Sequence, residues 1–213
     1  MNNLDKIYVI NLKERLDRKN HILNQFNKFN IKNYEFVDAI KPSLDQVNEW
    51  CENYCIRAKN YVSDFNKYKI GCLGCLQSHL KIYKDIVKNN YKNCLILEDD
   101  CLIQNNNIDE YIKYCINTNY GLFYLGGTNS VKPTKIKNDL YKSNKTHTTH
   151  AYIISYDCAK YIEQNINNFE KEIDIYLSDI IQSKFFCYCL YPSYYIQLDG
   201  FSDIQGKNIN YNM

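Results

Sequence analysis

The sequence predicts an α/β sandwich, in which helices cover both faces of a mainly parallel, mixed β-sheet. Short apolar runs, typical of buried strands, alternate along the chain with amphipathic segments of helical period. The run at 94–97, Cys-Leu-Ile-Leu, is apolar throughout, as is typical of a strand covered on both faces. The 213 residues, 45% of them hydrophobic and 23% charged, can bury a sizeable core, so we expect one domain over 1–213.

The elements follow from these two patterns in chain order. Short apolar runs predict strands at 6–11, 34–38, 94–98, 121–127, 148–156 and 185–191. Apolar residues recurring at helical spacing predict helices at 12–29, 74–88, 108–117, 157–166 and 174–183. Two polar stretches remain. In 41–68, Ser43 and Gln46 have the spacing of a helix start, and 128–146 is expected to be a mobile, basic loop.

Three adjacent carboxylates, Glu98, Asp99 and Asp100, end the apolar run at 94–97. Unpaired charge is costly to bury, so we expect them at the carboxyl end of the strand, where open α/β sheets place ligands. Alternate residues of an extended chain point the same way, so Glu98 and Asp100 can share a ligand while Asp99 faces elsewhere. Oxygen ligands suit Mg²⁺ or Mn²⁺, which suit phosphates. The run predicts a metal–diphosphate site, with a solvated strand end as the simpler alternative.

Polar side chains also follow the first strand and begin the last helix. Asn11 closes the strand, and Arg15 and Arg18 are three residues apart, hence on one helix face. An amide and two guanidinium groups suit a nucleotide base and its phosphates, although an ordinary solvated helix start has the same pattern. Asp174 and Asp179 offer carboxylates that could take a proton from an acceptor hydroxyl, or could simply cap their helix.

A fourth motif stands at the start of the helix predicted at 74–88. Gly71 and Gly74 permit close approach of the helix N-terminus, and Ser78 and His79 follow in its second turn. The positive end of the helix favours anions, so His79 could bind a phosphate oxygen or a substrate hydroxyl. A hydrogen-bonded core histidine is the alternative.

Composition excludes several classes of function. Lys and Arg exceed Asp and Glu by only two (26 against 24), so no charge field recruits nucleic acid. No apolar run approaches the roughly 20 residues that span a bilayer, and no signal peptide is evident. We therefore expect an intracellular, cytoplasmic protein with ten reduced cysteines. Three cysteine pairs resemble parts of zinc sites, but none repeats at finger-like spacing, so we favour free thiols: Cys51-x₃-Cys55, Cys72-x-x-Cys75 and Cys187-x-Cys189.

Together the motifs resemble glycosyltransferase family 25, which includes lipooligosaccharide and procollagen galactosyltransferases. Gly71-x-x-Gly74-Cys75-x-x-Ser78-His79 matches the family pattern at every fixed position. Leu95-Ile-Leu-Glu-Asp-Asp100 matches its strand and acidic triplet, and the opening Ile7-Tyr-Val-Ile-Asn-Leu12 is similar to its first strand. The resemblance covers residues 5–205.

The resemblance implies a GT-A fold, a Rossmann-like α/β/α sandwich, and inverting transfer of a hexose, galactose or glucose, from a UDP-sugar to a hydroxyl. The acceptor would be hydroxylysine in a collagen-like protein or a surface glycan. Mn²⁺ (or Mg²⁺) would be coordinated by Asp100 and Glu98. Asp174 is the expected base, with Asp179 second. The residues implied to contact the nucleotide sugar are Asn11, Leu12, Arg15, Arg18, Ser78, His79, Glu98, Asp99, Gly126 and Gly127.

The chain departs from the family at two points. Cys72 stands where many members carry Glu, and no histidine follows His150 to complete the metal shell, so Asp203 or Asp199 would substitute. These departures leave open a catalytically weak or inactive member that binds a nucleotide sugar or a partner. Another alternative is a phosphohydrolase-type enzyme using Glu98, Asp100 and the pair His147-x-x-His150. It leaves the glycine- and histidine-containing motif unexplained.

Overall fold

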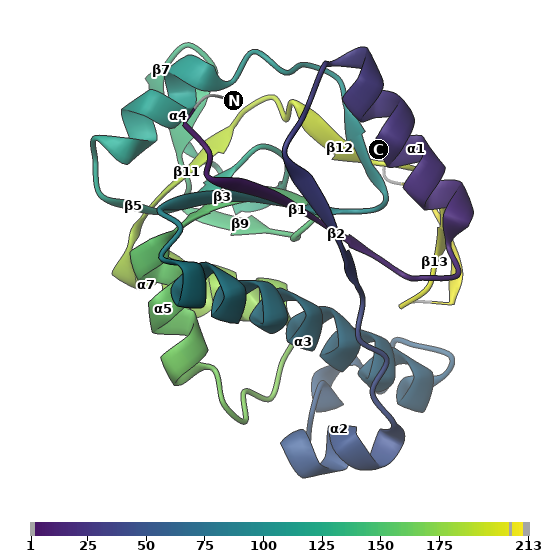
Figure 1. Cartoon of the computed structure of the whole chain (residues 1–213). Coiled ribbons are helices and arrows are strands. Elements are labelled where there is room, and N and C mark those ends of the chain that lie inside the picture. The colour runs from purple at the N-terminus through teal and green to yellow at the C-terminus, as the bar shows by residue number, and fades with distance from the viewer. Residues whose placement is uncertain (1–2, 205, 211–213) are drawn as a thin grey trace.

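The computed structural model describes residues 3–204 and 206–210, and it is the α/β sandwich that the sequence predicts (Figure 1). Residues 1–2 and 211–213, which belong to the expected domain of 1–213, lie outside the described residues. The strands of the main sheet are β1 (Lys6–Asn11), β2 (Tyr34–Asp38), β3 (Asn93–Glu98), β5 (Tyr120–Tyr124), β7 (Thr134–Lys137), β8 (Leu140–Lys142), β10 (Ala151–Ser155) and β11 (Phe186–Leu190). Their order is β2-β1-β3-β10-β5-β11-β8-β7.

The sheet is mixed: β10 and β8 run in one direction, and the other six strands run in the opposite direction. Strand β1 pairs in parallel with β2 and β3, and β5 pairs in parallel with β11. Strand β10 lies between the two parallel groups and is antiparallel to both β3 and β5, while β8 is antiparallel to β11. The expected fold class is therefore confirmed.

Helices cover both faces of this sheet in three layers (Figure 1). One face carries α1 (Leu16–Lys28) and α4 (Asp109–Ile116), and the other carries α3 (Phe65–Asn89) and α5 (Tyr156–Asn165). Strand β1 shows why both faces are apolar: Ile7 and Val9 pack on the α1 side, and Tyr8 and Ile10 on the α3 side. This alternation follows from the two-residue period of an extended chain.

Two expected helices differ from the structure. Helix α3 begins at Phe65, nine residues before its predicted start, with Asp64 as its N-cap. Gly71, Gly74 and His79 therefore lie in the helix interior, and the explanation of His79 through the positive helix end is wrong. Helix α1 begins at Leu16, which is exposed, and it buries Ile22, Gln25 and Phe26 instead.

The two stretches left without apolar patterns are more ordered than expected. Ser43 and Gln46 form the predicted capping box at the start of α2 (Leu44–Trp50), and η1 (Ile56–Ala58) follows. Residues 128–146, expected to be a mobile loop, instead contain β6 (Thr128–Val131), β7, β8 and part of β9 (Lys145–His147), paired antiparallel. Their side chains are mostly exposed on the edge of the molecule, so no apolar alternation marks them.

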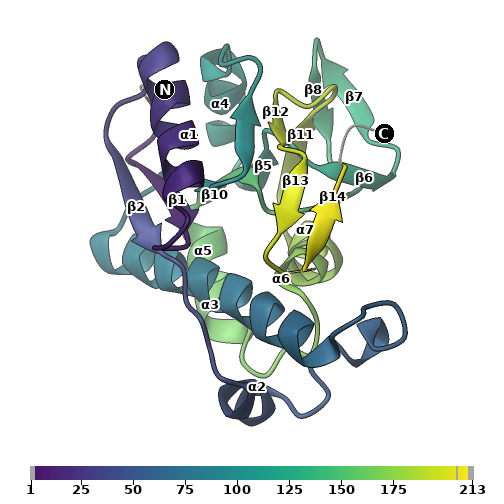
Figure 2. The same cartoon turned by 90° about the vertical axis from the view of Figure 1, so that its right-hand side faces the viewer.

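The last third of the chain completes the fold. The helix predicted at 174–183 is a continuous helical stretch of α6 (Ile173–Tyr176), the π-helix η2 (Leu177–Ile181) and α7 (Gln182–Lys184). Short strands β4 (Cys101–Ile103) and β12 (Tyr195–Gln197) pair, as do β13 (Gly200–Ser202) and β14 (Lys207–Ile209) (Figure 2). Within residues 3–204 and 206–210, no helix combines the length and apolar character needed to cross a bilayer.

Candidate active site

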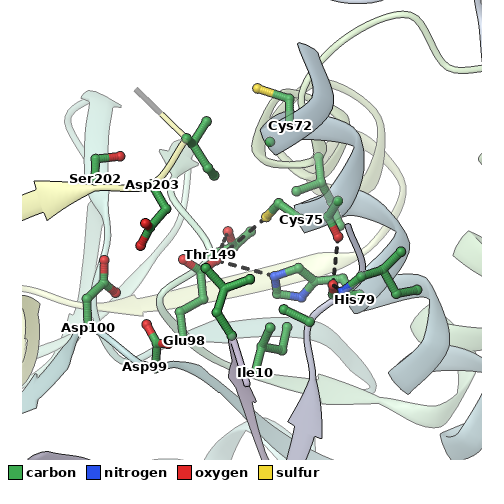
Figure 3. A pocket seen from close by; sticks show the side chains of 18 of the residues that line it. Ile10, Cys72, Cys75, His79, Glu98, Asp99, Asp100, Thr149, Ser202 and Asp203 are labelled. Atoms are coloured by element: carbon green, nitrogen blue, oxygen red, sulfur yellow. Dashed lines mark hydrogen bonds and ion pairs between the residues drawn. The ribbon is translucent and has the colours of Figure 1, made fainter. Parts of the chain in front are cut away.

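A cavity of about 520 Å³ opens where β1 and β3 end, as expected for an α/β sheet. Its wall is built from segments far apart in the sequence, including the acidic triplet and the middle of α3 (Figure 3). Leu12 and Arg18, from the N-terminal part of the chain, line the cavity. The segments 148–149, 172–174 and 202–204 also contribute to its wall. The volume is within the range of small-molecule sites, so the cavity can hold a nucleotide-sized ligand.

Glu98, the last residue of β3, is held by side chains from two other elements. Its Oε1 accepts hydrogen bonds from the Thr149 hydroxyl at 2.5 Å and from His79 Nε2 at 3.3 Å, and the Cys75 thiol lies at 4.0 Å. Burial alone would raise the pKa of Glu98, but the interactions with His79 and Thr149 outweigh it and lower this pKa. Glu98 is therefore a fixed carboxylate, and its Oε2 receives none of these bonds.

His79 belongs to a buried chain of hydrogen bonds. Because a carboxylate can only accept, Nε2 donates to Glu98, while Nδ1 forms a hydrogen bond with the Tyr152 hydroxyl at 2.7 Å. Tyr152 in turn bonds the Tyr83 hydroxyl at 2.5 Å. All three rings are fully buried. His79 also lies on the cavity wall, and its bond to Glu98 adds a positioning role to the predicted contact with substrate.

Ser78, next to His79, also has a structural role in place of the predicted ligand contact. Its fully buried hydroxyl accepts from the backbone N–H of Ile40 at 2.8 Å and donates to the carbonyl of Gly74 at 2.6 Å. These bonds fasten the segment after β2 to α3. Gly74 serves the same contact, since a Cβ there would meet the Ile40 carbonyl oxygen at 2.5 Å.

Asp99 faces the N-terminal strand and helix, as its position between two other acids predicts. The Asn11 amide donates to it at 2.7 Å and the Arg18 guanidinium at 2.8 Å. Asn11 is buried, its amide also contacts the Arg15 carbonyl, and it is not part of the cavity wall. Asn11 therefore holds Asp99 in place. Arg18 does reach the cavity, and it also donates to the Phe201 carbonyl at 2.7 Å.

Asp100 is the acid with unfilled bonding capacity. Among the described residues, its buried Oδ1 has no hydrogen-bond partner, and Oδ2 has only a long contact of 3.5 Å from Gln197. Arg18 lies 3.8 Å from Oδ2. Burial and the neighbouring Glu98 raise the pKa of Asp100 to about 7. A carboxylate in this state is stabilised by a cation, so a divalent metal fits here.

Asp203, predicted to complete the metal shell, does lie on the cavity wall beside Asp100 (Figure 3). It forms an ion pair with Arg15 at 2.5 Å, and Arg15 also pairs with Asp17 at 2.9 Å. Within the described part of the chain, Asp203 does not gather with Glu98 and Asp100 into a set of oxygens within 4.8 Å of one another. Arg15 is also absent from the cavity wall, so Arg15 and Asp203 fasten β13 to α1.

Asp174 lines the cavity at the start of α6. Burial and the nearby Glu172 raise its pKa, against hydrogen bonds from the backbone of Ile175 and Thr148. Thr148 has a φ of 71°, which is uncommon for a β-branched residue and places backbone strain at the cavity. Asp179, the second predicted base, lies outside the cavity in an ion pair with Lys145 at 3.0 Å.

Other predicted residues also lie away from the cavity. A Cβ on Gly126 would overlap the Tyr195 carbonyl and the ring of His150, and one on Gly127 would overlap Thr146. These glycines permit close packing and do not approach a sugar. The buried His150 contacts the Tyr195 carbonyl at 3.1 Å, and His147 pairs with Ser130 at 2.9 Å. Neither histidine lines the cavity, so the predicted phosphohydrolase pair does not form.

The structure adds residues that the sequence did not single out. Thr149, Lys67, Glu172 and Gln197 all line the cavity. Thr149 lies within the strand predicted at 148–156, whereas β10 begins at Ala151, and nothing in the strand pattern indicated a contact with Glu98. The others carry no pattern that distinguishes them from ordinary surface residues.

The sequence matches the family described as glycosyltransferase family 25 (LPS biosynthesis protein) over residues 4–183. The chain belongs to glycosyltransferase family 25. It is 35% identical over 74% of its length to a procollagen lysyl hydroxylase and glycosyltransferase of Acanthamoeba polyphaga mimivirus, and 34% identical over 44% to a putative glycosyltransferase of Haemophilus influenzae. It spans 19% and 31% of those relatives.

Solved structures show a more distant likeness to this family 25 chain. A glycosyltransferase involved in glycosylation of the major capsid of PBCV-1 superposes with a TM-score of 0.48 and 9% identity, covering 93% of this chain and 94% of that one. Membership of family 25 is not accounted for by the phosphohydrolase alternative.

Proposed function

We propose that the chain transfers a hexose, galactose or glucose, from a UDP-sugar to a hydroxyl group, with inversion and in a metal-dependent reaction. The observation that carries this proposal is Asp100: a buried carboxylate with a raised pKa and an oxygen without a partner among the described residues, on the wall of a nucleotide-sized cavity. Next to Asp100, the hydrogen bonds from His79 and Thr149 to Glu98 both go to Oε1 and not to Oε2.

In this proposal Asp100 and Glu98 hold Mn²⁺ or Mg²⁺. When bound, the ion would neutralise the charge that develops on the departing UDP. Arg18 supports the same step, since its guanidinium lies on the cavity wall and is fixed by Asp99 and the Phe201 carbonyl. His79 and Thr149 keep Glu98 ionised and oriented.

Asp174 is the proposed base. Inversion requires the acceptor hydroxyl to attack from the side opposite the leaving group, with a carboxylate to take its proton. Asp174 lies on the same cavity as the triplet but on a different element, and burial raises its pKa, which favours proton uptake. Asp179, outside the cavity, is not proposed to take part.

Two acceptor classes follow from the relatives. The names of the mimivirus relative and of mouse procollagen galactosyltransferase 2 support hydroxylysine in a collagen-like protein. The family description, which names LPS biosynthesis, supports a surface glycan. Both acceptors present a hydroxyl, so the proposed roles of Asp100 and Asp174 are the same for either.

The test is UDP release from a panel of UDP-sugars, with and without Mn²⁺ and with each acceptor class. Wild type should release UDP from one donor of the panel, and this release should require the metal ion. The Asp100→Asn variant should show no release. Asp174→Asn should lower acceptor-dependent turnover by about 10²–10⁴-fold while UDP still binds. Asp179→Asn, the matched control outside the cavity, should retain wild-type turnover. No release from any donor, with UDP still bound, would favour the alternative of an inactive nucleotide-sugar-binding or partner-binding member.

A further inference from the structure

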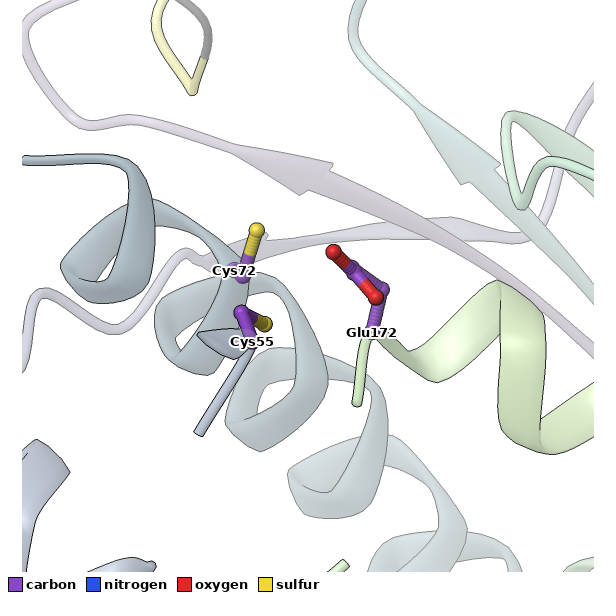
Figure 4. Close-up of side chains that lie close together, drawn as sticks. All are labelled: Cys55, Cys72 and Glu172. Atoms are coloured by element: carbon purple, nitrogen blue, oxygen red, sulfur yellow. The ribbon is translucent and has the colours of Figure 1, made fainter. Parts of the chain in front are cut away.

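A second group of metal-type side chains lies next to the cavity and has no part in the proposed transfer. The thiols of Cys55 and Cys72 and a carboxylate oxygen of Glu172 all lie within 4.8 Å of one another (Figure 4). Cys55 precedes η1, Cys72 is in α3, and Glu172 is the N-cap residue of α6. Three elements that are far apart in the sequence therefore converge on one point.

The buried environment of this group is incompletely satisfied. The Tyr54 hydroxyl is fully buried and, among the described residues, has no hydrogen-bond partner. Burial raises the pKa of Tyr54, and the charges of Cys55, Cys72, Cys75 and Glu172 raise it further. Buried polar groups without partners are rare in folded proteins, so a missing ligand is a direct explanation.

The backbone of Cys55 and a hydrogen bond to Glu172 hold these two residues in place. Cys55 has φ 55° and ψ 23°, a left-handed conformation that is uncommon outside glycine and asparagine and is often found at functional sites. It is held by a hydrogen bond from its N–H to the Glu170 carbonyl at 2.7 Å. The Tyr68 hydroxyl donates to Glu172 at 2.9 Å, the kind of outer contact that orients carboxylate ligands of metals.

We propose that Cys55, Cys72 and Glu172 bind a Zn²⁺ ion, with a fourth position open to the cavity wall that Cys72 and Glu172 help to form. Two thiolates and a carboxylate suit zinc, with Zn–S distances of about 2.3 Å and Zn–O distances of about 2.0–2.2 Å. Thiolate ligands select Zn²⁺ over Mn²⁺ or Mg²⁺, so this site differs in chemistry from the one at Asp100.

Binding requires both thiols to lose their protons. The contact with Cys55 and burial raise the pKa of Cys72 well above its usual value, so a cation must displace the proton of this thiol to bind it. Binding of Zn²⁺ by two thiolates releases one proton from each thiol. The ion would cross-link η1, α3 and the start of α6.

One other group could compete for the ion. Cys75, His79 and Glu98 also lie within 4.8 Å of one another. There, however, both ring nitrogens of His79 and one oxygen of Glu98 already take part in the hydrogen bonds that fix Glu98. We therefore place the zinc at Cys55, Cys72 and Glu172.

The test uses the whole chain, kept reduced and stripped of metal by a chelator, and titrated with Co²⁺ as a coloured substitute for Zn²⁺. Wild type should bind Co²⁺ with a thiolate charge-transfer band and tetrahedral d–d absorption, which Zn²⁺ then removes. Cys55→Ser and Cys72→Ser should lose these bands. Glu172→Gln, the mildest change, should weaken Zn²⁺ binding by roughly 10–100-fold. This readout does not depend on glycosyl transfer.

Two controls make the result decisive. Cys51→Ser, near the site but outside the group, should bind as wild type, and so should Cys75→Ser. Circular dichroism confirms that each variant is folded. No tetrahedral spectrum in reduced wild type would overturn the proposal, as would binding that survives in the folded Cys55 and Cys72 variants and disappears in Cys75→Ser. A Cys55–Cys72 disulfide with no metal uptake after reduction would also overturn it.

Discussion

Three adjacent acids in this chain occupy three different environments. Glu98 accepts hydrogen bonds from Thr149 and His79, and its pKa is lowered. Asp99 forms an ion pair with Arg18. Asp100, with burial and a like charge beside it, has a pKa raised to about 7. Neighbouring carboxyl groups whose surroundings move their pKa values apart are typical of functional sites.

The buried chain from Glu98 to Tyr83 can be tested at a single residue. Tyr152→Phe removes the hydroxyl that bonds both His79 and Tyr83, so two buried polar groups lose a partner. We expect the free energy of unfolding to fall by about 1–3 kcal/mol, measured by urea denaturation. Tyr61→Phe, at a side chain that is 85% exposed, should change it by less than about 0.5 kcal/mol. Equal effects in the two variants would mean that the chain of hydrogen bonds contributes nothing.

A sequence motif predicts where in the fold a residue lies, but it does not predict where the side chain of that residue points. Glu98, Asp100 and Asp174 were predicted correctly to line the cavity. They stand at a strand end or a helix start, and both are visible as patterns in the sequence. Asn11 and Ser78 stand in equally clear patterns, yet both side chains are bonded inward. The direction in which such a side chain points depends on partners distant in the sequence, so no local pattern records it.

Helix α3 carries the element-scale constraint on the site. Its middle turns pack against the segment after β2 through Gly74 and Ser78, which are four residues apart and share one face of the helix. That contact fixes one wall of the cavity, to which Gly74, Cys75 and His79 belong. Replacing glycine with alanine normally stabilises a helix, so the glycine at position 74 is explained by the limited space beside it.

Alanine substitutions in α3 measure this constraint. Gly74→Ala would press a Cβ against the Ile40 carbonyl at 2.5 Å, and backbone there can move only with the strand behind it. We expect the free energy of unfolding to fall by about 1–3 kcal/mol, despite the higher helix propensity of alanine. The control is Gly71→Ala, whose Cβ would meet Ile204 at 3.0 Å or more, and it should cost less. A Gly74→Ala protein as stable as Gly71→Ala would contradict the close approach. Thermal or urea unfolding of both variants decides it.

Element prediction was accurate where a short run is rich in residues that favour strands. The strand runs at 6–11 and 34–38 appear with those bounds, because both contain mainly residues suited to the sheet. The first nine residues of α3 were missed, since Asn66 and Lys67 interrupt any apolar stripe there. The exposed edge strands within 128–146 were missed for the same reason: their pairing partners, not their own side chains, make them strands.

At the scale of the molecule, the cavity depends on contacts between the two ends of the chain. The hairpin of β13 and β14 is tied to α1 through the Arg15–Asp203 ion pair and the bond from Arg18 to the Phe201 carbonyl. Figure 2 shows the two strands of this hairpin side by side. Because Ser202 and Ile204 line the cavity with Arg18, a ligand that fills it contacts segments from both ends.

A ligand with such contacts binds only the folded chain, and this gives a prediction for the whole molecule. UDP with Mn²⁺ at 100 times the dissociation constant should add about 2.7 kcal/mol to the free energy of unfolding. For a chain of 213 residues, this corresponds to a rise in Tm of roughly 5–10 °C in a thermal scan. Asp100→Asn should lose the part of the shift that depends on Mn²⁺, because it removes the proposed ligand of the ion, whereas Asp179→Asn should keep all of it. If UDP gives the same shift in a chelator as with Mn²⁺, the cavity binds the nucleotide without metal, and Asp100 has another role.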